Sequence, residues 1–302
     1  MKNSKFDNQD KSKLDRYAEI IQYKPTPENI GYMHELQITG LFPHSDPKTN
    51  RYSIKDGHKR ISIIGGHEVD SDKPIGVPYG SLPRLFTAYI CTQAVLLESR
   101  KINLGENLSD FLQALGLNIT GGKRGDITRV KKQLWKYINA TISYAEAGEH
   151  EGQQYKRGIQ TSLVDAYELW TGRDIHQNDM FESYLIISEA LYKSLKAKPI
   201  PIDIRALKAL KSSPLALDLY MWLNWRVYGS HRKNSYVSWQ QVMDQCGGEY
   251  SDAKEFARKA KKWLKKIKNF WPELEYETPR GRLKILSSSS SHVKQRDEKD
   301  RH

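Results

Sequence analysis

The stretch of residues 76–144 most constrains what this chain can fold into, because apolar-faced helices alternate there with glycine turns. Ser81 can act as an N-cap, and apolar residues recur behind it at helical spacing. A short extended piece at 101–104 leads to a second apolar-faced helix, which Gly116 ends as a C-cap. The predicted order is therefore helix, short strand, helix and turn.

A long basic helix follows that turn. Three glycines within residues 121–125 hold the turn, and Asp126 can cap the helix. Its apolar residues fall on one side and cationic residues occupy much of the rest. A helix with one face in a core and a cationic face outward, reached from a shorter helix, suits the major groove of DNA. The alternative is a solvated basic helix, which is commoner among proteins in general.

The same order of elements recurs in the C-terminal third. Two helices at 204–210 and 214–227 precede a short strand, a helix that ends at Cys246 and a glycine turn. A second basic helix, Asp252–Asn269, is more charged than the first, and two strands joined by a Pro-Arg-Gly turn follow it. The two halves share no residue-by-residue similarity, so the repeat is one of structure.

Each basic helix is followed by a hairpin that we expect to act as a wing. In the first unit, two apolar extended segments flank a polar insert with its tip near Gly148 to Gly158. In the second unit, the tip would place arginines in a minor groove or on phosphate. A further tight hairpin is predicted at Asp56-Gly57, between two alternating segments.

The predicted fold class is α+β, mainly helical, with tandem winged-helix domains, each a helix-turn-helix plus a β-hairpin wing. A disordered basic arm is expected at 1–30 and an N-terminal winged-helix domain with an extended lead-in at 31–197. A C-terminal winged-helix domain is expected at 198–286, and a low-complexity, disordered tail at 287–302.

The net charge favours a polyanionic partner. The 302 residues carry a formal charge of +12, and the pI is about 9.4. An anionic membrane surface is the competing polyanion. The sequence holds neither a run of apolar residues that could span a bilayer nor an apolar segment resembling a signal peptide, so we expect a cytoplasmic protein without a membrane partner.

Catalytic motifs are missing. The residues around Gly122-Lys123 fail the phosphate-loop pattern because the first glycine is displaced and Arg124 follows the lysine. His58 and His67 have no second pair of ligands at metal spacing, and Cys91 and Cys246 sit among apolar residues as small core side chains. We therefore expect no enzyme activity, no cofactor and no metal.

The residues expected to contact DNA come from both units. The first unit supplies Lys123, Arg124, Thr128, Arg129, Lys132 and Lys136, and its hairpin supplies Lys156 and Arg157. The second unit supplies Lys254, Arg258, Lys261, Lys262 and Lys265, with Arg280 and Arg282 at its hairpin. Arginines can read guanine edges through two hydrogen bonds, whereas lysines mostly contact phosphate.

Roughly residues 40–190 resemble the RepA-type plasmid replication initiators. The resemblance rests on an ordered set of motifs: Pro78-Tyr79-Gly80-Ser81-Leu82-Pro83-Arg84, Ser99-Arg100 with Ile102, Leu104 and Gly105, Leu108-Ser109 with Phe111, Leu115-Gly116-Leu117, Thr120-Gly121-Gly122, Gly125 and Gln133-Leu134. That family usually has an arginine soon after the position of Leu134, where this chain has Trp135 and Lys136.

The resemblance implies a protein that binds repeated sites, or iterons, in double-stranded origin DNA. It further implies opening of the adjacent duplex, recruitment of the host initiator and replicative helicase, and a possible homodimer. Three alternatives stay open: a winged-helix transcriptional repressor without initiator activity, a nickase that uses a tyrosine, and a membrane-surface protein.

Overall fold

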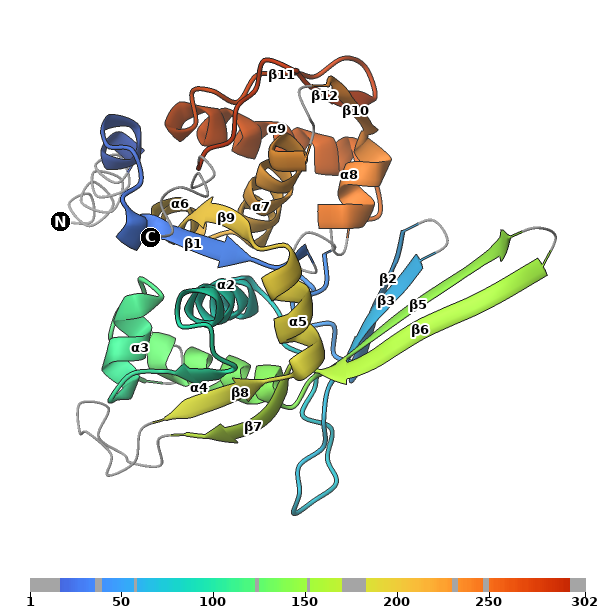
Figure 1. Cartoon of the computed structure of the whole chain (residues 1–302). Coiled ribbons are helices and arrows are strands. Elements are labelled where there is room, and N and C mark those ends of the chain that lie inside the picture. The colour runs from blue at the N-terminus through green and yellow to red at the C-terminus, as the bar shows by residue number, and fades with distance from the viewer. Residues whose placement is uncertain are drawn as a thin grey trace.

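Two long apolar helices, α2 (Ser81–Leu96) and α7 (Pro214–Gly229), pack against each other in the middle of the molecule (Figure 1). The structure is a computed structural model. It describes residues 17–35, 40–56, 59–122, 125–150, 153–169, 183–229, 233–246 and 250–293. Both helices have mostly buried side chains, as expected for helices that are apolar nearly all round.

The first unit is built on α2. It continues with β4 (Lys101–Asn103), α3 (Leu108–Ala114), α4 (Asp126–Ile138), β7 (Val164–Glu168) and β8 (Tyr184–Ile187). The three strands form an antiparallel sheet in the order β4-β8-β7. α5 (Glu189–Ala197) follows this sheet.

The second unit repeats that plan. α6 (Ile204–Leu210) and α7 are followed by β10 (Ser235–Ser238), α8 (Trp239–Cys246), α9 (Ala253–Phe270), β11 (Tyr276–Glu277) and β12 (Arg282–Ile285). Its sheet has the order β10-β12-β11 and is also antiparallel. The predicted recurrence of the element order is confirmed, and the strand order recurs with it.

The hairpin predicted as the wing of the first unit belongs to a different sheet. β5 (Thr141–His150) and β6 (Gln153–Ser162) join β2 (Arg51–Asp56) and β3 (Lys59–Ile64) in the order β2-β3-β5-β6. The edge of β5 that does not pair with β6 forms backbone hydrogen bonds with β3, whose residues Ile61 and Ile63 are buried. The prediction was therefore wrong: the hairpin that closes the first unit's own sheet is β7–β8. The hairpin predicted at Asp56-Gly57 is confirmed by the β2–β3 pairing.

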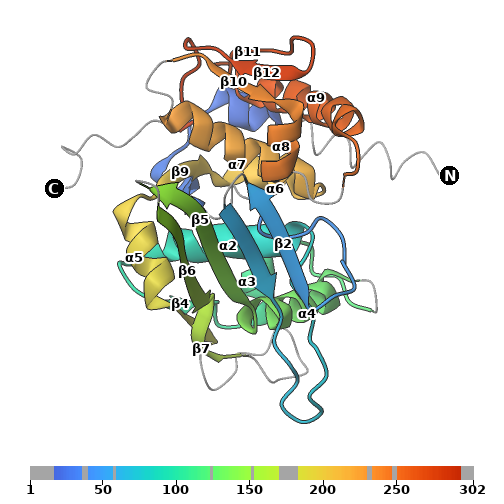
Figure 2. The same cartoon turned by 90° about the vertical axis from the view of Figure 1, so that its right-hand side faces the viewer.

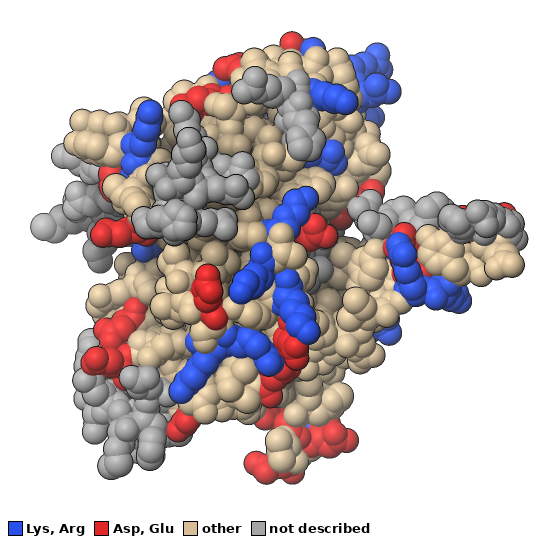
Figure 3. All heavy atoms as spheres, viewed as in Figure 1, with Lys and Arg blue, Asp and Glu red and all other residues tan. Residues whose placement is uncertain are grey.

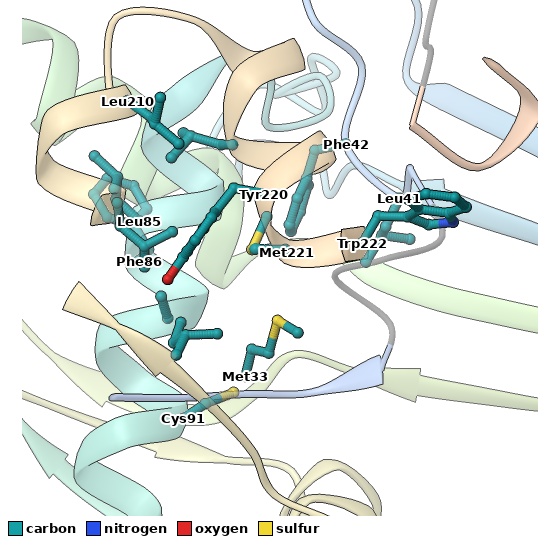
Figure 4. Packing of buried hydrophobic residues seen from close by; sticks show 14 of the residues in the cluster. Met33, Leu41, Phe42, Leu85, Phe86, Cys91, Leu210, Tyr220, Met221 and Trp222 are labelled. Atoms are coloured by element: carbon teal, nitrogen blue, oxygen red, sulfur yellow. The ribbon is translucent and has the colours of Figure 1, made fainter. Parts of the chain in front are cut away.

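A small two-stranded sheet ties the beginning of the described chain to the second unit. β1 (Ile30–Met33), which follows the short helix η1 (Pro27–Asn29), pairs antiparallel with β9 (Ile200–Asp203). One hydrophobic core runs through both units. Figure 4 shows its middle, with Phe86 and Cys91 of α2, Met33 of β1 and Tyr220 of α7 among the buried side chains. The two units thus share one interior.

Both ends of the described chain pack onto that core. In the helical segment 17–22, Ile20 is buried, and the ring of Tyr17 stacks on Phe270 of α9. In residues 287–293, which were expected in a disordered tail, Val293 is buried, and the indole of Trp271 donates to the Ser290 carbonyl at 3.0 Å. Residues 1–16 of the expected arm and 294–302 of the expected tail lie outside the described residues.

A buried ion pair joins the two central helices. The Arg84 guanidinium of α2 donates through Nε and Nη2 to the two carboxylate oxygens of Asp218 on α7, at 2.6 and 2.7 Å. It also donates to the carbonyls of Gly80 and Phe42. The His44 ring lies 2.8 Å from Asp218 and covers its remaining side. Both partners of the ion pair are about 3% exposed, so this contact is satisfied entirely within the protein.

The C-terminal end of α3 follows the sequence expectation, and its N-terminal end permits a test. Asn107 caps the first turn by accepting from the backbone N–H of Asp110 at 3.0 Å, and Gly116 follows the last turn with a φ of 68°. Asn107→Ala is expected to lower the free energy of unfolding by about 1 kcal/mol, because that N–H loses its acceptor. Urea unfolding followed by circular dichroism measures the change.

Gln113→Ala is the matched control for the cap, because Gln113 lies on the exposed face of the same helix. It should change the free energy of unfolding by less than about 0.5 kcal/mol. If both variants unfold at the same urea concentration, the side chain of Asn107 does not stabilise the helix.

Candidate nucleic-acid interface

The turn before α4 is held by polar side chains. Thr120 accepts from the backbone N–H of Asp126 at 3.0 Å, and the Asp126 carboxylate accepts from the backbone N–H of Asn118. The hydroxyl of Thr128 donates to the Gly122 carbonyl at 2.9 Å. Gly125 occupies the N-cap position, and Asp126 is the first helical residue, where its negative charge interacts favourably with the positive end of the helix dipole. These contacts set the direction in which α4 leaves the turn.

The first half of α4 presents a cationic row to solvent. Thr128, Arg129 and Lys132 are exposed, as predicted for residues that contact DNA, and Lys131 is exposed beside them. The Arg129 guanidinium is 58% exposed and rests 3.0 Å from the Asp126 carboxylate, an i,i+3 pair within one turn. Such an exposed pair is weak, so the arginine can exchange it for a phosphate or a base.

Lys136 lies outside this row, contrary to the expectation that it contacts DNA. It is 7% exposed, its ammonium points to the Val77 carbonyl at 3.4 Å, and it lies over the ring of Tyr79. Burial lowers the pKa of Lys136, although Asp46 acts in the opposite direction. The neighbouring Gln133 accepts from the backbone N–H of Tyr79 at 2.9 Å. The last turns of α4 therefore hold the loop that leads into α2.

In the second unit, α9 presents a longer cationic row. Asp252 caps the helix by accepting from the backbone N–H of Lys254 at 2.9 Å. The apolar stripe at 256, 260, 264 and 267 is buried, as the helical spacing predicts. On the opposite side the predicted residues Lys254, Arg258, Lys262 and Lys265 are exposed. Lys261 is half-buried, with its ammonium 5.7 Å from the ring centre of Trp239.

Figure 2 places α4 and α9 on the same side of the molecule, on the right in that view, with α5 on the other side. Lysines and arginines also gather over α5 on the face seen in Figure 3, where acidic side chains lie among them. There Lys193 pairs with Glu189 at 2.6 Å, and Arg100 pairs with Asp165 at 2.5 Å. The α4 and α9 side therefore carries the rows that sequence analysis assigned to DNA.

The predicted hairpin residues are divided between two places. Lys156 and Arg157 are exposed on β6, in the hairpin that projects from the body in Figure 1. Arg157 pairs with Glu146 at 2.9 Å. Arg280 is exposed in the connection from β11 to β12, and Arg282 is exposed at the start of β12. The predicted Lys123 and Arg124 lie outside the described residues.

Three cationic residues of α9, Lys259, Lys266 and Lys268, lie in the same basic run but outside the predicted set, and the first two lie beside aromatic rings. Lys266 is exposed with its ammonium 4.4 Å from the ring centre of Trp263, and Lys259 is half-buried with its ammonium 4.8 Å from that of Tyr250. Charge alone could not single them out from their neighbours. Lys259 and Lys266 each have an aromatic ring beside the ammonium, as the predicted Lys261 also does, and the ring beside Lys259 comes from outside the helix.

Other kinds of site find little support. Within the described ranges, no group of three or more His, Cys, Asp or Glu side chains could hold a metal ion. No helix in that part of the chain is long and apolar enough to cross a membrane. Cys91 and Cys246 are free and buried, and burial raises the pKa of the Cys91 thiol to about 12, which keeps it protonated. Both cysteines are core residues, as predicted.

Comparison with known proteins agrees with the fold and with the resemblance. The family model described as "Plasmid encoded RepA protein" matches residues 77–241, more than half of the chain. No curated protein matches the chain. A crystal structure of selenomethionine derivatives of domains 2 and 3 of RctB aligns with a TM-score of 0.53 at 10% identity, over 82% of this chain and 95% of that one. A second structure of the same RctB domains aligns with a TM-score of 0.51 at 13% identity, over 83% and 96%. The α+β arrangement is therefore one already seen in solved structures.

Proposed function

The chain belongs to the family of plasmid-encoded RepA proteins, and on that premise we propose that it binds repeated sequences in the duplex of a plasmid origin. There it promotes opening of the adjacent DNA and recruits the host initiator and the replicative helicase. Membership in this plasmid replication initiator family supports the role in replication. The arrangement of α4 and α9 supports the mode of DNA binding.

We infer that each unit is a winged helix. Both units run helix, strand, helix, helix and hairpin, with the first strand paired to the last. In that arrangement α4 and α9 are the recognition helices. The wing of the first unit is then the hairpin of the paired strands β7 and β8, and the wing of the second is the hairpin of β11 and β12, whose short connection carries Arg280. The β5–β6 hairpin, with Lys156 and Arg157, is an insertion between recognition helix and wing.

The observation that carries the proposal is the placement of two cationic helices, at equivalent positions of two repeated units, on one side of the molecule. Each has a buried apolar stripe and an exposed row, so each can enter a major groove without losing its packing. Arg129 and Arg258 are the candidates for reading bases, and the lysines beside them contribute the salt-dependent contact with phosphates.

The test is a footprint and gel-shift titration on DNA that flanks the gene, at several salt concentrations. Protected repeats spaced by whole turns of the duplex would support an iteron-binding initiator. Salt-sensitive binding without protected repeats would reduce the function to general DNA binding. A maintenance assay separates an initiator from a repressor. A plasmid that carries the same DNA as its origin should be maintained in cells only when this protein is made, because a repressor would bind the repeats without supporting replication.

A further inference from the structure

A hollow of about 340 Å³ lies between α9 and the start of α7. Its lining combines three lysines of α9, Lys259, Lys262 and Lys266, with the rings of Tyr250 and Trp263. Ser213, which caps α7 by accepting from the backbone N–H of Ala216 at 3.2 Å, and Leu215 complete it. This set of residues, called the α9–α7 hollow below, is concave and strongly cationic.

The rings hold two of the ammonium groups in place. The Nζ of Lys266 lies 4.4 Å from the ring centre of Trp263, and the Nζ of Lys259 lies 4.8 Å from that of Tyr250. Lys259 also pairs with Glu255 at 2.9 Å. No acidic side chain of the described residues pairs with Lys262 or Lys266. Three ammonium groups therefore face one carboxylate, and two of the three are positioned before any ligand arrives.

The opposite flank of α9 differs. The ammonium of Lys268 donates to Glu275 at 2.5 Å and to the Pro272 carbonyl at 2.9 Å, so its charge is already satisfied. Lys261 lies over Trp239, at the start of α8. The hollow is thus on the flank of α9 where Glu255 is the one carboxylate, among the described residues, that pairs with a lysine of the lining.

Helix geometry relates the hollow to the exposed row of α9. At about 100° per residue, Lys259 and Lys266 lie about 100° round the helix from the row that contains Arg258 and Lys265. When that row faces the floor of a major groove, the hollow faces the wall, where the sugar–phosphate backbone runs. Ammonium groups are compact point charges that suit a phosphate better than the two-point pattern of a base edge.

We propose that the α9–α7 hollow binds a backbone phosphate of duplex DNA beside the groove that α9 enters. This inference rests on the proposed DNA-binding function and adds a contact that fixes the position of α9 on the duplex without reading its sequence. Lys266 is the main ligand because it has no acidic partner, and Lys259 contributes after exchanging Glu255 for the phosphate.

The test begins with Lys266→Gln in the full-length protein. Loss of one phosphate contact should reduce the slope of log K against log salt by about 0.9, on the target duplex and on a random duplex alike. The ratio of the two affinities should stay unchanged. Lys268→Gln is the matched control, since it removes the same charge from the same helix on the other flank, and its slope should equal that of the unmodified protein.

Single methylphosphonates, which replace one phosphate by a neutral group, then locate the contact. At one position of the target, the methylphosphonate should weaken binding of the unmodified protein and of Lys268→Gln. It should not weaken binding of Lys266→Gln, because that variant has already lost the contact. If every position costs the Lys266→Gln variant as much as the unmodified protein, the hollow binds no backbone phosphate.

Two further outcomes would overturn the proposal in different ways. If footprints persist and Lys266→Gln behaves like Lys268→Gln, the hollow is rejected and the DNA-binding function stands. If no duplex is bound at any salt concentration, both fail together. Added pyrophosphate tests a free phosphate as the ligand. If it raises the melting temperature of the unmodified protein and of Lys268→Gln but not of Lys266→Gln, while the salt slopes of all three agree, the hollow takes a free phosphate and not the backbone.

Discussion

An Asp218→Ala variant is expected to lose about 3–5 kcal/mol of unfolding free energy, because Arg84 would keep its charge in the interior without a counterion. The guanidinium is about 3% exposed and cannot turn to water without disrupting the contact between α2 and α7. Urea unfolding followed by circular dichroism measures the loss. The double variant Arg84→Met with Asp218→Leu should recover much of it, since it removes both charges together.

The matched control is Asp165→Ala, which breaks the exposed pair with Arg100. That pair should contribute no more than about 1 kcal/mol. If Asp218→Ala costs no more than this control, the buried ion pair does not hold the two units together.

The same ion pair makes stability depend on pH. Burial by itself would raise the pKa of Asp218, but the Arg84 charge and the hydrogen bonds from His44 and Arg84 outweigh it and hold that pKa below its ordinary value of 3.8. The stabilisation is therefore complete above the pKa that Asp218 has in the unfolded protein. It is lost as the pH falls through the lower pKa that Asp218 has in the folded protein. Between those two pKa values, the free energy of unfolding should fall less steeply with decreasing pH in the double variant than in the unmodified protein.

Arg258→Ala is expected to weaken binding to the target duplex by about 1–3 kcal/mol and to relax the preference for one base pair. Arg258 is exposed in the middle of the α9 row, where a planar guanidinium can bond the O6 and N7 of guanine together. Arg258→Lys keeps the charge but loses the two-point pattern, so it should keep the salt slope and lose the base preference. Gel-shift titrations on the target and on single-base variants measure both.

Lys196→Ala is the control for the lost charge, because Lys196 is exposed on α5, on the side away from α9 in Figure 2. It should leave the base preference unchanged. If Arg258→Ala weakens binding equally on all sequences, the arginine contacts phosphate and another residue reads the base.

Much of this fold could be predicted because local patterns determine it. The stripe at 256, 260, 264 and 267 is buried as its spacing predicts, and the two segments predicted to form a hairpin, now β2 and β3, do pair. Which strands then pair is not a local property. The β5–β6 hairpin alternates as a wing would, but its partner, β3, lies some eighty residues earlier in the chain and cannot be found from the hairpin.

Lys136 illustrates a similar limit at the candidate site. It lies two helical turns after Arg129, so periodicity correctly places both on one face of α4. The loop that contains Val77 and Tyr79 covers only the last turns of that face and buries the lysine. The α9–α7 hollow was also beyond sequence reasoning, because Ser213 and Tyr250 reach it from outside α9.

The interior that both units share has a consequence for the DNA. Since a single core joins α2 to α7, the separation of α4 and α9 is a property of the protein and cannot adapt to the spacing of two half-sites. Each base pair inserted between half-sites rotates one of them by about 35° around the duplex axis. With the proposed duplex binding, the DNA would have to absorb that rotation by twisting, and the length of the spacer would then be part of what this protein recognises.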